Sequence, residues 1–387
     1  MSAVVLYGHR VEQPGATGIG YYVRRLITAI ASSEHHDITY SVGATPEPPS
    51  EIGPPSGLPV LRPNLPRSRS ARRLLHLSWL VTGRPRVDRA FHRPDLLHVL
   101  YPAIPVPTRA RLVFTIHDLM ALTNPDWVTR YEHIRYARSF KQAADRAELL
   151  IADSQKTARE IPEILGVEES RIRVIHLGVD PVFWGPVDGD SIEQACRKHD
   201  LCPGRYFVVL GTVSTRKNLQ VLLNALAVVK GQLDYPVIAV GPRGLGIEAI
   251  EDQVERLGVR QLVRLPGWLP EPELLALLHG STALLHPSRD EGFGLTPLEG
   301  MAAGIPVAAS NAGAIPEVTA DAALLIDPDD VESWSNAMLR LAGDDEFRNE
   351  AIARGHSRAR LFTWERTANE TIAVHRELLS GIKPVRH

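Results

Sequence analysis

The sequence predicts an α/β protein built from two doubly wound, Rossmann-like domains. Short buried strands alternate with amphipathic helices along both halves of the chain, which is the pattern of parallel sheets covered by helices. The chain has 387 residues, more than one hydrophobic core usually supports. Residues 178–204 are rich in glycine, proline and aspartate and include a predicted linker. We therefore expect domains at 1–180 and 204–362, followed by a C-terminal helix within 363–387.

The composition is that of a globular protein in a reducing compartment. Hydrophobic residues make up 44% of the chain and charged residues 23%. The net charge of −2 lacks the basic excess that is typical of nucleic-acid-binding proteins. Cys196 and Cys202 have no metal-ligand spacing, and two thiols cannot build a disulfide framework. The start of the chain lacks a signal-peptide pattern, and no run approaches about 20 apolar residues. We expect a cytoplasmic protein.

The first half is predicted to begin with a strand, a glycine-containing loop and a helix. The strand is Val4–Tyr7, the loop is Gly8–Gly20, and the helix has apolar residues at helical spacing: Tyr22, Val23, Leu26, Ile27 and Ile30. Gly18 and Gly20 could let the backbone approach a phosphate, because glycine has no side chain in the way. The alternative is a flexible loop with glycines at a helix start. A dinucleotide-binding fold is disfavoured, since the full glycine fingerprint is missing.

A basic, amphipathic segment follows at residues 62–93. Its apolar run, Leu74–Val81, is surrounded by arginines: Arg67, Arg69, Arg72, Arg73, Arg84, Arg86 and Arg89. The segment could dock peripherally on an anionic membrane surface, such as the inner membrane, or bind an anionic acceptor. The alternative is a helix that packs on the sheet and keeps a solvated basic rim.

The remaining strands of the first half place polar residues at their carboxyl ends. A buried strand at Leu112–Ile116 ends in His117 and Asp118. Open α/β sheets bind ligands beyond the carboxyl ends of their strands, so His117 is a candidate site residue. The alternative is a capping aspartate beside a packed histidine. The other elements expected here are strands at Leu96–Leu100, Leu149–Ala152 and Ile172–Ile175, and a helix at Tyr131–Ala147.

The second half has a cationic loop after its first strand. The strand Tyr206–Leu210 leads to Arg216 and Lys217 at the start of a helix. Arginine can grip two oxygens and lysine supplies a point charge, so the pair could stabilise a diphosphate leaving group. A solvated pair is the alternative, although cations are unfavourable at the positive end of a helix. Fixed cations would make a metal unnecessary, and we predict no metal and no cofactor.

A strand, a glycine turn, a helix and another strand follow in a βαβ arrangement at residues 282–310. Glu291 and the turn Gly292, Phe293 and Gly294 precede a helix that starts at Leu295. The unpaired N–H groups of that helix favour an anion.

A carboxylate in the turn suits sugar hydroxyls better than a bare phosphate, because hydroxyls donate hydrogen bonds to it. Glu299 lies about two turns along the same helix and could hold a ribose. The alternative is two solvated glutamates at a helix end. The other elements expected in this half are helices at Asp190–His199, Ile247–Leu257, Glu271–Leu278, Val331–Leu341, Glu346–Arg358 and Trp364–Leu379, and strands at Val237–Val240 and Val263–Leu265.

These motifs resemble the retaining GT-B glycosyltransferases of family four, also called glycosyl transferases group 1, and most closely the mannosyltransferase-like members. The resemblance rests on residues 17–23, 114–118, 178–180, 211–218 and 286–307 and covers nearly the whole chain. It implies two Rossmann-like domains facing across a cleft, an acceptor-side N-terminal domain, and a last helix that returns to it.

The resemblance also implies roles for single residues. Arg216 and Lys217 would neutralise the diphosphate, Glu291 would orient the donor sugar, and Glu299 would hold the ribose. His117 would contact the donor sugar. Backbone groups would contact the donor at Gly18, Gly20, Gly292, Phe293, Gly294 and Leu295.

We therefore expect a retaining glycosyltransferase that moves a hexose from a nucleotide sugar to a hydroxyl acceptor without a metal. The donor would be GDP-mannose-like or a UDP-sugar, and the acceptor a glycan, a lipid-linked sugar or a small natural product. One alternative is a sugar-nucleotide epimerase on the same fold, which would form its product without an acceptor. The other is a nucleotide-sugar-binding protein without turnover.

Overall fold

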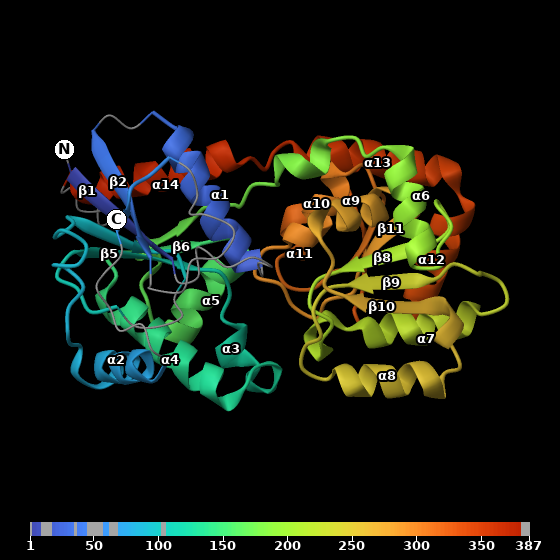
Figure 1. The fold of residues 1–387 in the computed structure, drawn as a ribbon, viewed down its shortest axis with the longest axis horizontal. Helices are drawn as coiled ribbons and strands as arrows, with labels where there is room; N and C mark the ends of the chain where they lie inside the picture. The colour runs from blue at the N-terminus through green and yellow to red at the C-terminus, as the bar shows by residue number, and fades with distance from the viewer. Residues whose placement is uncertain are drawn as a thin grey trace. The chain divides into compact units, whose positions relative to one another are not determined.

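The chain forms two compact units, each an open parallel sheet with helices on both faces (Figure 1). Unit 1 contains Met1–Gly178 and Thr363–His387, and unit 2 contains Val179–Phe362. This computed structural model describes residues 2–8, 18–34, 37–44, 57–61, 69–101 and 106–380. The predicted class, two Rossmann-like α/β domains, is confirmed.

Unit 1 has a seven-stranded parallel sheet in the order β3-β2-β1-β4-β5-β6-β7. β1 pairs with β2 on one side and with β4 on the other, so the strand order reverses there, at the point where such sheets bind ligands. The strands are β1 Ser2–Gly8, β2 Ile38–Ala44, β3 Val60–Leu61, β4 Leu96–Val99, β5 Arg111–Ile116, β6 Leu149–Ala152 and β7 Ile172–Val174.

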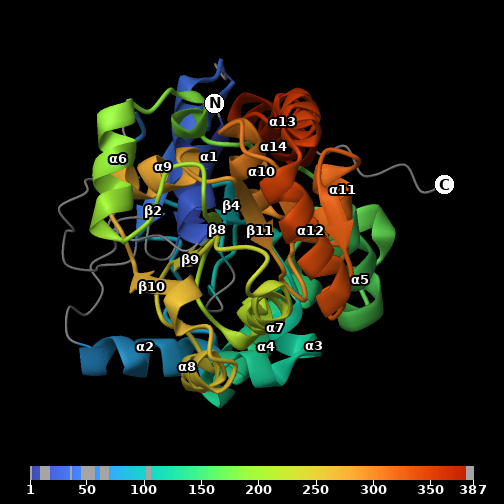
Figure 2. The same cartoon turned by 90° about the vertical axis from the view of Figure 1, so that its right-hand side faces the viewer.

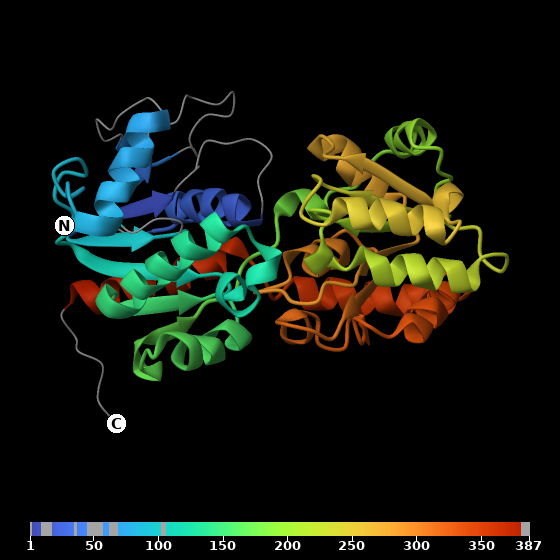
Figure 3. The same cartoon turned by 90° about the horizontal axis from the view of Figure 1, so that it is seen from below.

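Helices cover both faces of this sheet, with α1 and α14 on one face and α2 and α4 on the other (Figure 1, Figure 3). α1 buries the five apolar residues whose spacing predicted its inner face. The helices of unit 1 are α1 Gly18–Ser32, α2 Arg69–Thr82, α3 Met120–Thr123, α4 Arg130–Arg146, α5 Gln155–Leu165 and α14 Trp364–Leu379.

The part of the basic segment that the structure describes begins at Arg69, so Arg67 lies outside the described residues. In α2, Trp79 is 3% exposed and packs in the core of unit 1, as the packed-helix alternative expects. Leu74, Leu77 and Val81 are 67%, 54% and 75% exposed. The helix therefore packs on one side and presents an aliphatic stripe to solvent on another.

Unit 2 has a six-stranded parallel sheet in the order β10-β9-β8-β11-β12-β13, with the strand order reversing between β8 and β11. α9 and α10 lie on one face, and α7 and α8 on the other (Figure 2). The strands are β8 Phe207–Leu210, β9 Val237–Val240, β10 Val263–Gly267, β11 Ala283–His286, β12 Val307–Ser310 and β13 Leu324–Ile326. The helices are α6 Gly189–Lys198, α7 Leu219–Val229, α8 Ile247–Arg256, α9 Glu271–His279, α10 Leu295–Ala302, α11 Ile315–Thr319, α12 Val331–Gly343 and α13 Asp345–Ala359.

The sequence patterns missed three strands, β2, β3 and β13, and the three helices α3, α5 and α11. β3 and β13 have two and three residues, which is too short for a periodicity to show.

Cys196 and Cys202 are both free thiols. Within the described ranges, no helix is long and apolar enough to cross a bilayer.

Candidate functional site

The predicted site residues fall into two groups, one at the carboxyl edge of each sheet. The group in unit 2 begins at the turn Thr215–Lys217, which follows β8. Asn218 ends this turn in a left-handed conformation and is fully buried. Its side-chain amide donates to the carbonyls of Pro287, at 3.2 Å, and Pro328, at 2.7 Å. Asn218 thus fixes the turn that carries Arg216 and Lys217 against the loop after β11.

Both cations converge on the Glu291 carboxylate. Lys217 Nζ donates to Glu291 Oε1 at 2.6 Å, and Arg216 Nη1 lies 3.0 Å from the same oxygen. His286 Nε2, at the end of β11, lies 3.2 Å from it. The Lys217 and Glu291 side chains are 14% and 13% exposed. The structure therefore brings together three predicted residues and adds His286, to which the sequence analysis gave no role.

The electrostatics of this cluster favour an ionised carboxylate. Burial by itself raises the pKa of the Glu291 carboxyl, but Arg216 and Lys217 together outweigh it and hold that pKa well below its usual value. Burial lowers the pKa of Lys217, which Glu291 partly offsets. Burial also lowers the pKa of His286. Two cations face one close carboxylate, so the cluster can still attract an anion.

The glycine turn after Glu291 positions the start of α10. Gly294 has φ +117°, a backbone conformation that residues with a Cβ rarely adopt. Leu295 is the first residue of α10, and the first N–H groups of a helix have no partner within it. The Phe293 ring is buried edge-on against Phe362, with ring centroids 5.9 Å apart. In this turn the backbone is thus the part that can meet a ligand.

A second glycine, Gly313, packs closely against the Glu291 backbone. Gly313 has φ +61°, and a Cβ there would lie 2.5 Å from Glu291 N. The neighbouring Ala314 N–H donates to the Glu291 carbonyl at 2.9 Å. Only glycine allows this close approach, and the sequence analysis did not single it out.

Glu299 lies on α10 within electrostatic reach of Lys217 and Asp180. Burial raises the pKa of Glu299 to about 7, which Lys217 opposes and Asp180 reinforces. This carboxyl is therefore poised between its neutral and ionised forms near neutral pH. In either form its oxygens can accept a hydroxyl hydrogen bond.

In unit 1, His117 follows β5 and is held on both sides. Its Nδ1 lies 2.6 Å from Asp153 Oδ2, and its Nε2 lies 2.9 Å from the Leu100 carbonyl oxygen. Both partners are hydrogen-bond acceptors, and the two ring nitrogens can donate to both of them only when the ring is protonated. Burial lowers the pKa of His117, but Asp153 outweighs it and the net shift is upward. Asp118 Oδ1 accepts from Met120 N–H at 3.1 Å, at the start of α3, whose N-cap residue is Leu119.

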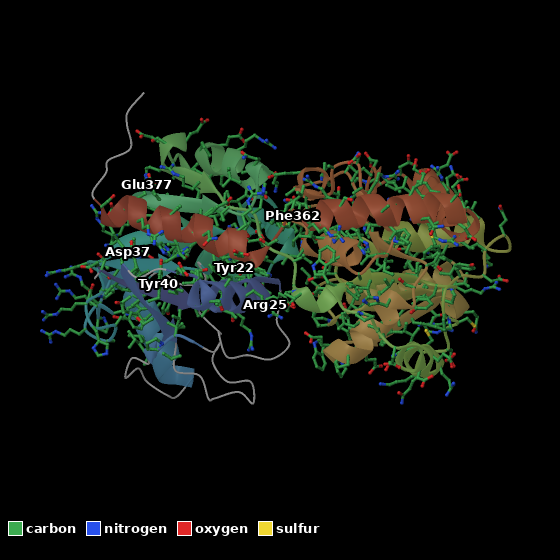
Figure 4. All side chains as sticks on the ribbon, turned by 90° about the horizontal axis from the view of Figure 1, so that it is seen from above. Tyr22, Arg25, Asp37, Tyr40, Phe362 and Glu377 are labelled. Carbon is green, nitrogen blue, oxygen red and sulfur yellow. The ribbon has the colours of Figure 1, made fainter. Side chains whose placement is uncertain are left out.

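A buried chain of hydrogen bonds lies beside His117, and the sequence analysis missed it. The Tyr22 ring packs edge-on against His117 with centroids 4.7 Å apart, and its hydroxyl bonds to Thr115 at 2.9 Å. Thr115 bonds to His98 at 2.9 Å, and His98 bonds to His375 of α14 at 3.0 Å. His375 in turn lies 2.9 Å from the Tyr40 hydroxyl. Figure 4 labels Tyr22 on α1 and Tyr40 on β2.

Gly18 and Gly20 lie in the first turn of α1. The loop before them, residues 9–17, falls outside the described residues. The phosphate contact that the sequence predicts for these two glycines stays a prediction.

Two doubly wound sheets in one chain, with a carboxylate held by two cations at the carboxyl edge of the second sheet, are the arrangement expected of a GT-B glycosyltransferase. Two family models match the chain: Glycosyltransferase Family 4 at residues 16–183 and Glycosyl transferases group 1 at residues 197–358.

Relatives of known function extend this match. The O-antigen chain mannosyltransferase B of Escherichia coli is 32% identical over 316 residues, which is 80% of each chain. The D-inositol 3-phosphate glycosyltransferase of Corynebacterium urealyticum is 29% identical over 69% of this chain and 66% of its own. The chain therefore belongs to the glycosyl transferases group 1, glycosyltransferase family 4.

Solved structures agree on the fold. WaaG, a glycosyltransferase involved in lipopolysaccharide biosynthesis, superposes with a TM-score of 0.72 at 18% identity, over 97% of this chain and 99% of that one. Anabaena Alr3699/HepE in complex with UDP and glucose superposes with a TM-score of 0.71 at 20% identity, over 99% of this chain and 100% of that one.

Proposed function

We propose that this glycosyltransferase is a metal-independent, retaining enzyme whose unit 2 holds the diphosphate and sugar of its donor at Arg216, Lys217, Glu291 and Glu299. The observation that carries the proposal is the convergence of Lys217 and Arg216 on Glu291 Oε1, at 2.6 and 3.0 Å. Two fixed cations beside a carboxylate suit a ligand that offers phosphate oxygens and hydroxyls together, as a nucleotide sugar does.

The cations would act on the leaving group. When the bond between the sugar anomeric carbon and the diphosphate breaks, negative charge grows on the phosphate oxygen. Arg216 and Lys217 are already in place, so they stabilise this charge without reorganisation. This is the work that a divalent cation does in many phosphate-handling enzymes, and it supports a mechanism without a metal.

Glu291 would orient the donor sugar. Its three close contacts among the described residues all fall on Oε1, which leaves the lone pairs of Oε2 for sugar hydroxyls. Glu299 would accept hydrogen bonds from the ribose hydroxyls. The first N–H groups of α10 would complete the donor site with the backbone of residues 292–295.

Retention would follow from attack on the side of the leaving group. Glu291 is a poor nucleophile, because two cations depress its pKa. The acceptor oxygen would instead bond to the anomeric carbon as the carbon–diphosphate bond breaks, and the acceptor proton would pass to the leaving phosphate oxygen. The family resemblance supports this route.

Unit 1 would serve the acceptor side. His117 was predicted to contact the donor sugar, and both of its ring nitrogens are engaged in this structure. The His117 ring would therefore act on the donor sugar through its positive charge, or it would first have to release Asp153 or the Leu100 carbonyl. The cytoplasmic location remains a prediction, as does the membrane contact predicted for segment 62–93.

The relatives guide the choice of donor. The mannosyltransferase name of the Escherichia coli relative supports a GDP-mannose-like donor. A UDP-sugar remains the other candidate, since HepE was solved with UDP-glucose. The hydroxyl acceptor would be a glycan, a lipid-linked sugar or a small natural product, and the Corynebacterium relative is named a D-inositol 3-phosphate glycosyltransferase.

The test is turnover in EDTA. The protein would be incubated with GDP-mannose or UDP-glucose and a panel of these acceptors, and nucleotide release and product linkage would be followed by NMR. We expect one donor to be used and an α-linked product from the α-configured donor. A β-linked product would exclude retention, and activity only after Mg²⁺ or Mn²⁺ is added would exclude the metal-independent mechanism. An inverted or eliminated sugar product formed without acceptor would favour an epimerase.

A further inference from the structure

Four side chains at the carboxyl edge of the unit 1 sheet form a cluster to which the proposed reaction gives no role. They are three tyrosines and one arginine: Tyr101, Tyr131, Arg135 and Tyr136. Tyr101 comes after β4, and the other three lie in the first two turns of α4. The Tyr101 and Tyr136 hydroxyls are hydrogen-bonded to each other. We call these four residues the tyrosine–arginine cluster.

The tyrosine–arginine cluster lies beside His117. α4 lies in the chain between β5 and the parallel strand β6, so its first turns are at the carboxyl edge, where such sheets bind ligands. His117 Nε2 lies 2.9 Å from the carbonyl oxygen of Leu100, the residue before Tyr101. Burial is the largest influence on the pKa of His117 and of Tyr136, and the Asp118 charge acts on both as well, so Asp118 lies near the two rings. A ligand held by the cluster would therefore lie next to the His117 loop.

Arg135 is a cation without a counter-charge. Within the described part of the chain, no carboxylate lies within ion-pair distance of its guanidinium, and its Nε is buried with no hydrogen-bond partner. Glu132, three residues earlier on α4, accepts instead from the N–H and the hydroxyl of Thr129, at 3.0 and 2.8 Å. A buried donor without an acceptor costs free energy, so an anionic ligand would supply the group that Arg135 lacks.

Two tyrosine rings hold this guanidinium in place. The Arg135 Cζ atom lies 5.2 Å from the centroid of the Tyr136 ring and 5.9 Å from that of the Tyr131 ring. Cation–π contacts restrain an arginine without using its N–H groups. Tyr136 stacks in turn on Phe140, a core residue of unit 1, with ring centroids 5.8 Å apart. The N–H groups of Arg135 are therefore preorganised for the oxygens of an anion.

The tyrosines offer the two kinds of surface that bind a sugar. Tyr131 is 67% exposed and Ile134, three residues further on, is 42% exposed, so α4 presents an apolar face here on which the C–H face of a sugar ring can pack. The hydrogen bond between Tyr101 and Tyr136 uses one of their two hydroxyl hydrogens, so the other can be donated to a sugar oxygen. Burial raises the pKa of Tyr136, which keeps its phenol protonated at neutral pH.

We propose that the tyrosine–arginine cluster is an acceptor subsite for an anionic sugar, one that carries a phosphate or a carboxylate. Arg135 binds the oxyanion, Tyr131 packs against the sugar ring, and the pair of Tyr101 and Tyr136 donates to a sugar oxygen. This assignment rests on the proposed function, because it concerns the acceptor side of that reaction. A neutral sugar fits less well, because it offers the buried Nε of Arg135 no negative charge. A purely structural role would explain the stacking of Arg135 but not its unpartnered Nε.

The test is a ligand-observed NMR titration of the full chain, without any nucleotide, against two matched series of sugars. Glucose and mannose would each be added as the neutral sugar, the uronate and the 6-phosphate, which differ only at carbon 6. We expect at least one anionic sugar to bind about tenfold or more tightly than its neutral parent, and the uronate and phosphate arms show which oxyanion is preferred. Arg135→Ala should weaken that anionic sugar by about 10–100-fold and remove the preference, as expected for a hydrogen bond to a charged group.

Two further variants separate ligand binding from effects on the fold. Lys141→Ala is the matched control, since Lys141 is 76% exposed and pairs with Asp145 at 2.9 Å. It lies about 9 Å further along α4 than Arg135 and should leave the binding of every sugar unchanged. Tyr131→Ala alters an exposed residue, so it should leave the fold intact and weaken the neutral and anionic sugars alike, by about fivefold.

Several results would overturn the acceptor subsite. They are no binding of any anionic sugar, an anion preference that survives in Arg135→Ala, a preference that is also lost in Lys141→Ala, and unchanged binding in Tyr131→Ala. A preference that is lost in Lys217→Ala and kept in Arg135→Ala would place the anion at the donor cations, and it would overturn the subsite too. The donor assignment can fail independently, because sugar binding that depends on Arg135 requires neither a bound nucleotide nor glycosyl transfer.

Discussion

Replacing Lys217 by alanine tests the assignment of the leaving-group site. Lys217 Nζ makes the shortest contact to the Glu291 carboxylate, at 2.6 Å, and both side chains are largely buried. When one preorganised group that stabilises the developing negative charge is removed, the activation free energy rises by about 3–4 kcal/mol, which lowers kcat by a factor of about 10²–10³. We expect a loss of this size with saturating donor.

The same substitution also affects the fold, and the two effects can be separated. Breaking a buried ion pair from one side costs about 3–5 kcal/mol. We expect the lower end of that range, because Glu291 keeps Arg216 at 3.0 Å and His286 at 3.2 Å. Urea unfolding would measure the stability, and kcat would be taken only under conditions where the variant is folded.

Lys230→Ala is the matched control. Lys230 is an exposed lysine of unit 2 whose Nζ donates to the Gly258 carbonyl at 3.3 Å. It should leave both kcat and stability nearly unchanged. If folded Lys217→Ala retained kcat within about threefold of the unaltered enzyme, less than 1 kcal/mol by the rate relation, the role given to Lys217 would be refuted.

Further predictions concern protonation and the glycine turn. The pKa of Glu299 is about 7 in the folded chain against 4.5 in the unfolded one, so stability falls as pH rises between these values. Glu299→Gln should therefore stabilise by about 1–2 kcal/mol at pH 8, allowing for partial solvent access, and by little at pH 4.5; equal effects in urea unfolding at both pH values would contradict this. Burial lowers the pKa of His375 to about 3 and that of His98 well below its usual value. Both should stay neutral as pH falls, and stability should drop below pH 6.5, with His375 alone contributing about 2 kcal/mol at pH 5; ring NMR signals of either residue titrating near pH 6.5 would disprove this. Gly294→Ala should cost about 1–3 kcal/mol and weaken nucleotide binding, because its φ is +117°. Gly343→Ala, where a Cβ meets nothing within 4 Å, is its control, and matching nucleotide affinities for the two variants would count against a role for the turn.

Local patterns predicted the elements of the fold well, because periodicity reports which side of an element is buried. The inner face of α1 is the clearest case. The strand–turn–helix unit around Glu291 was also visible, since its glycines and its helix lie within one short stretch.

The partners of the site residues could not be predicted from spacing. Lys217 and Glu291 are 74 residues apart, and their contact arises because β8 and β11 are neighbours in the sheet. His98 and His375 are 277 residues apart, and they meet only because the C-terminal helix packs in unit 1. Gly313 carries no local signal, since its conformation is imposed by the backbone of Glu291.

Calorimetric titration with GDP and with UDP in EDTA, on the unaltered protein and on Lys217→Ala, tests the central claim most directly. We predict that one of the two nucleotides binds without a metal and that Lys217→Ala binds it at least tenfold more weakly, a loss of about 1.4 kcal/mol. Binding that requires added Mg²⁺, or that is equally tight in Lys217→Ala, would contradict the assignment of the diphosphate to Arg216 and Lys217.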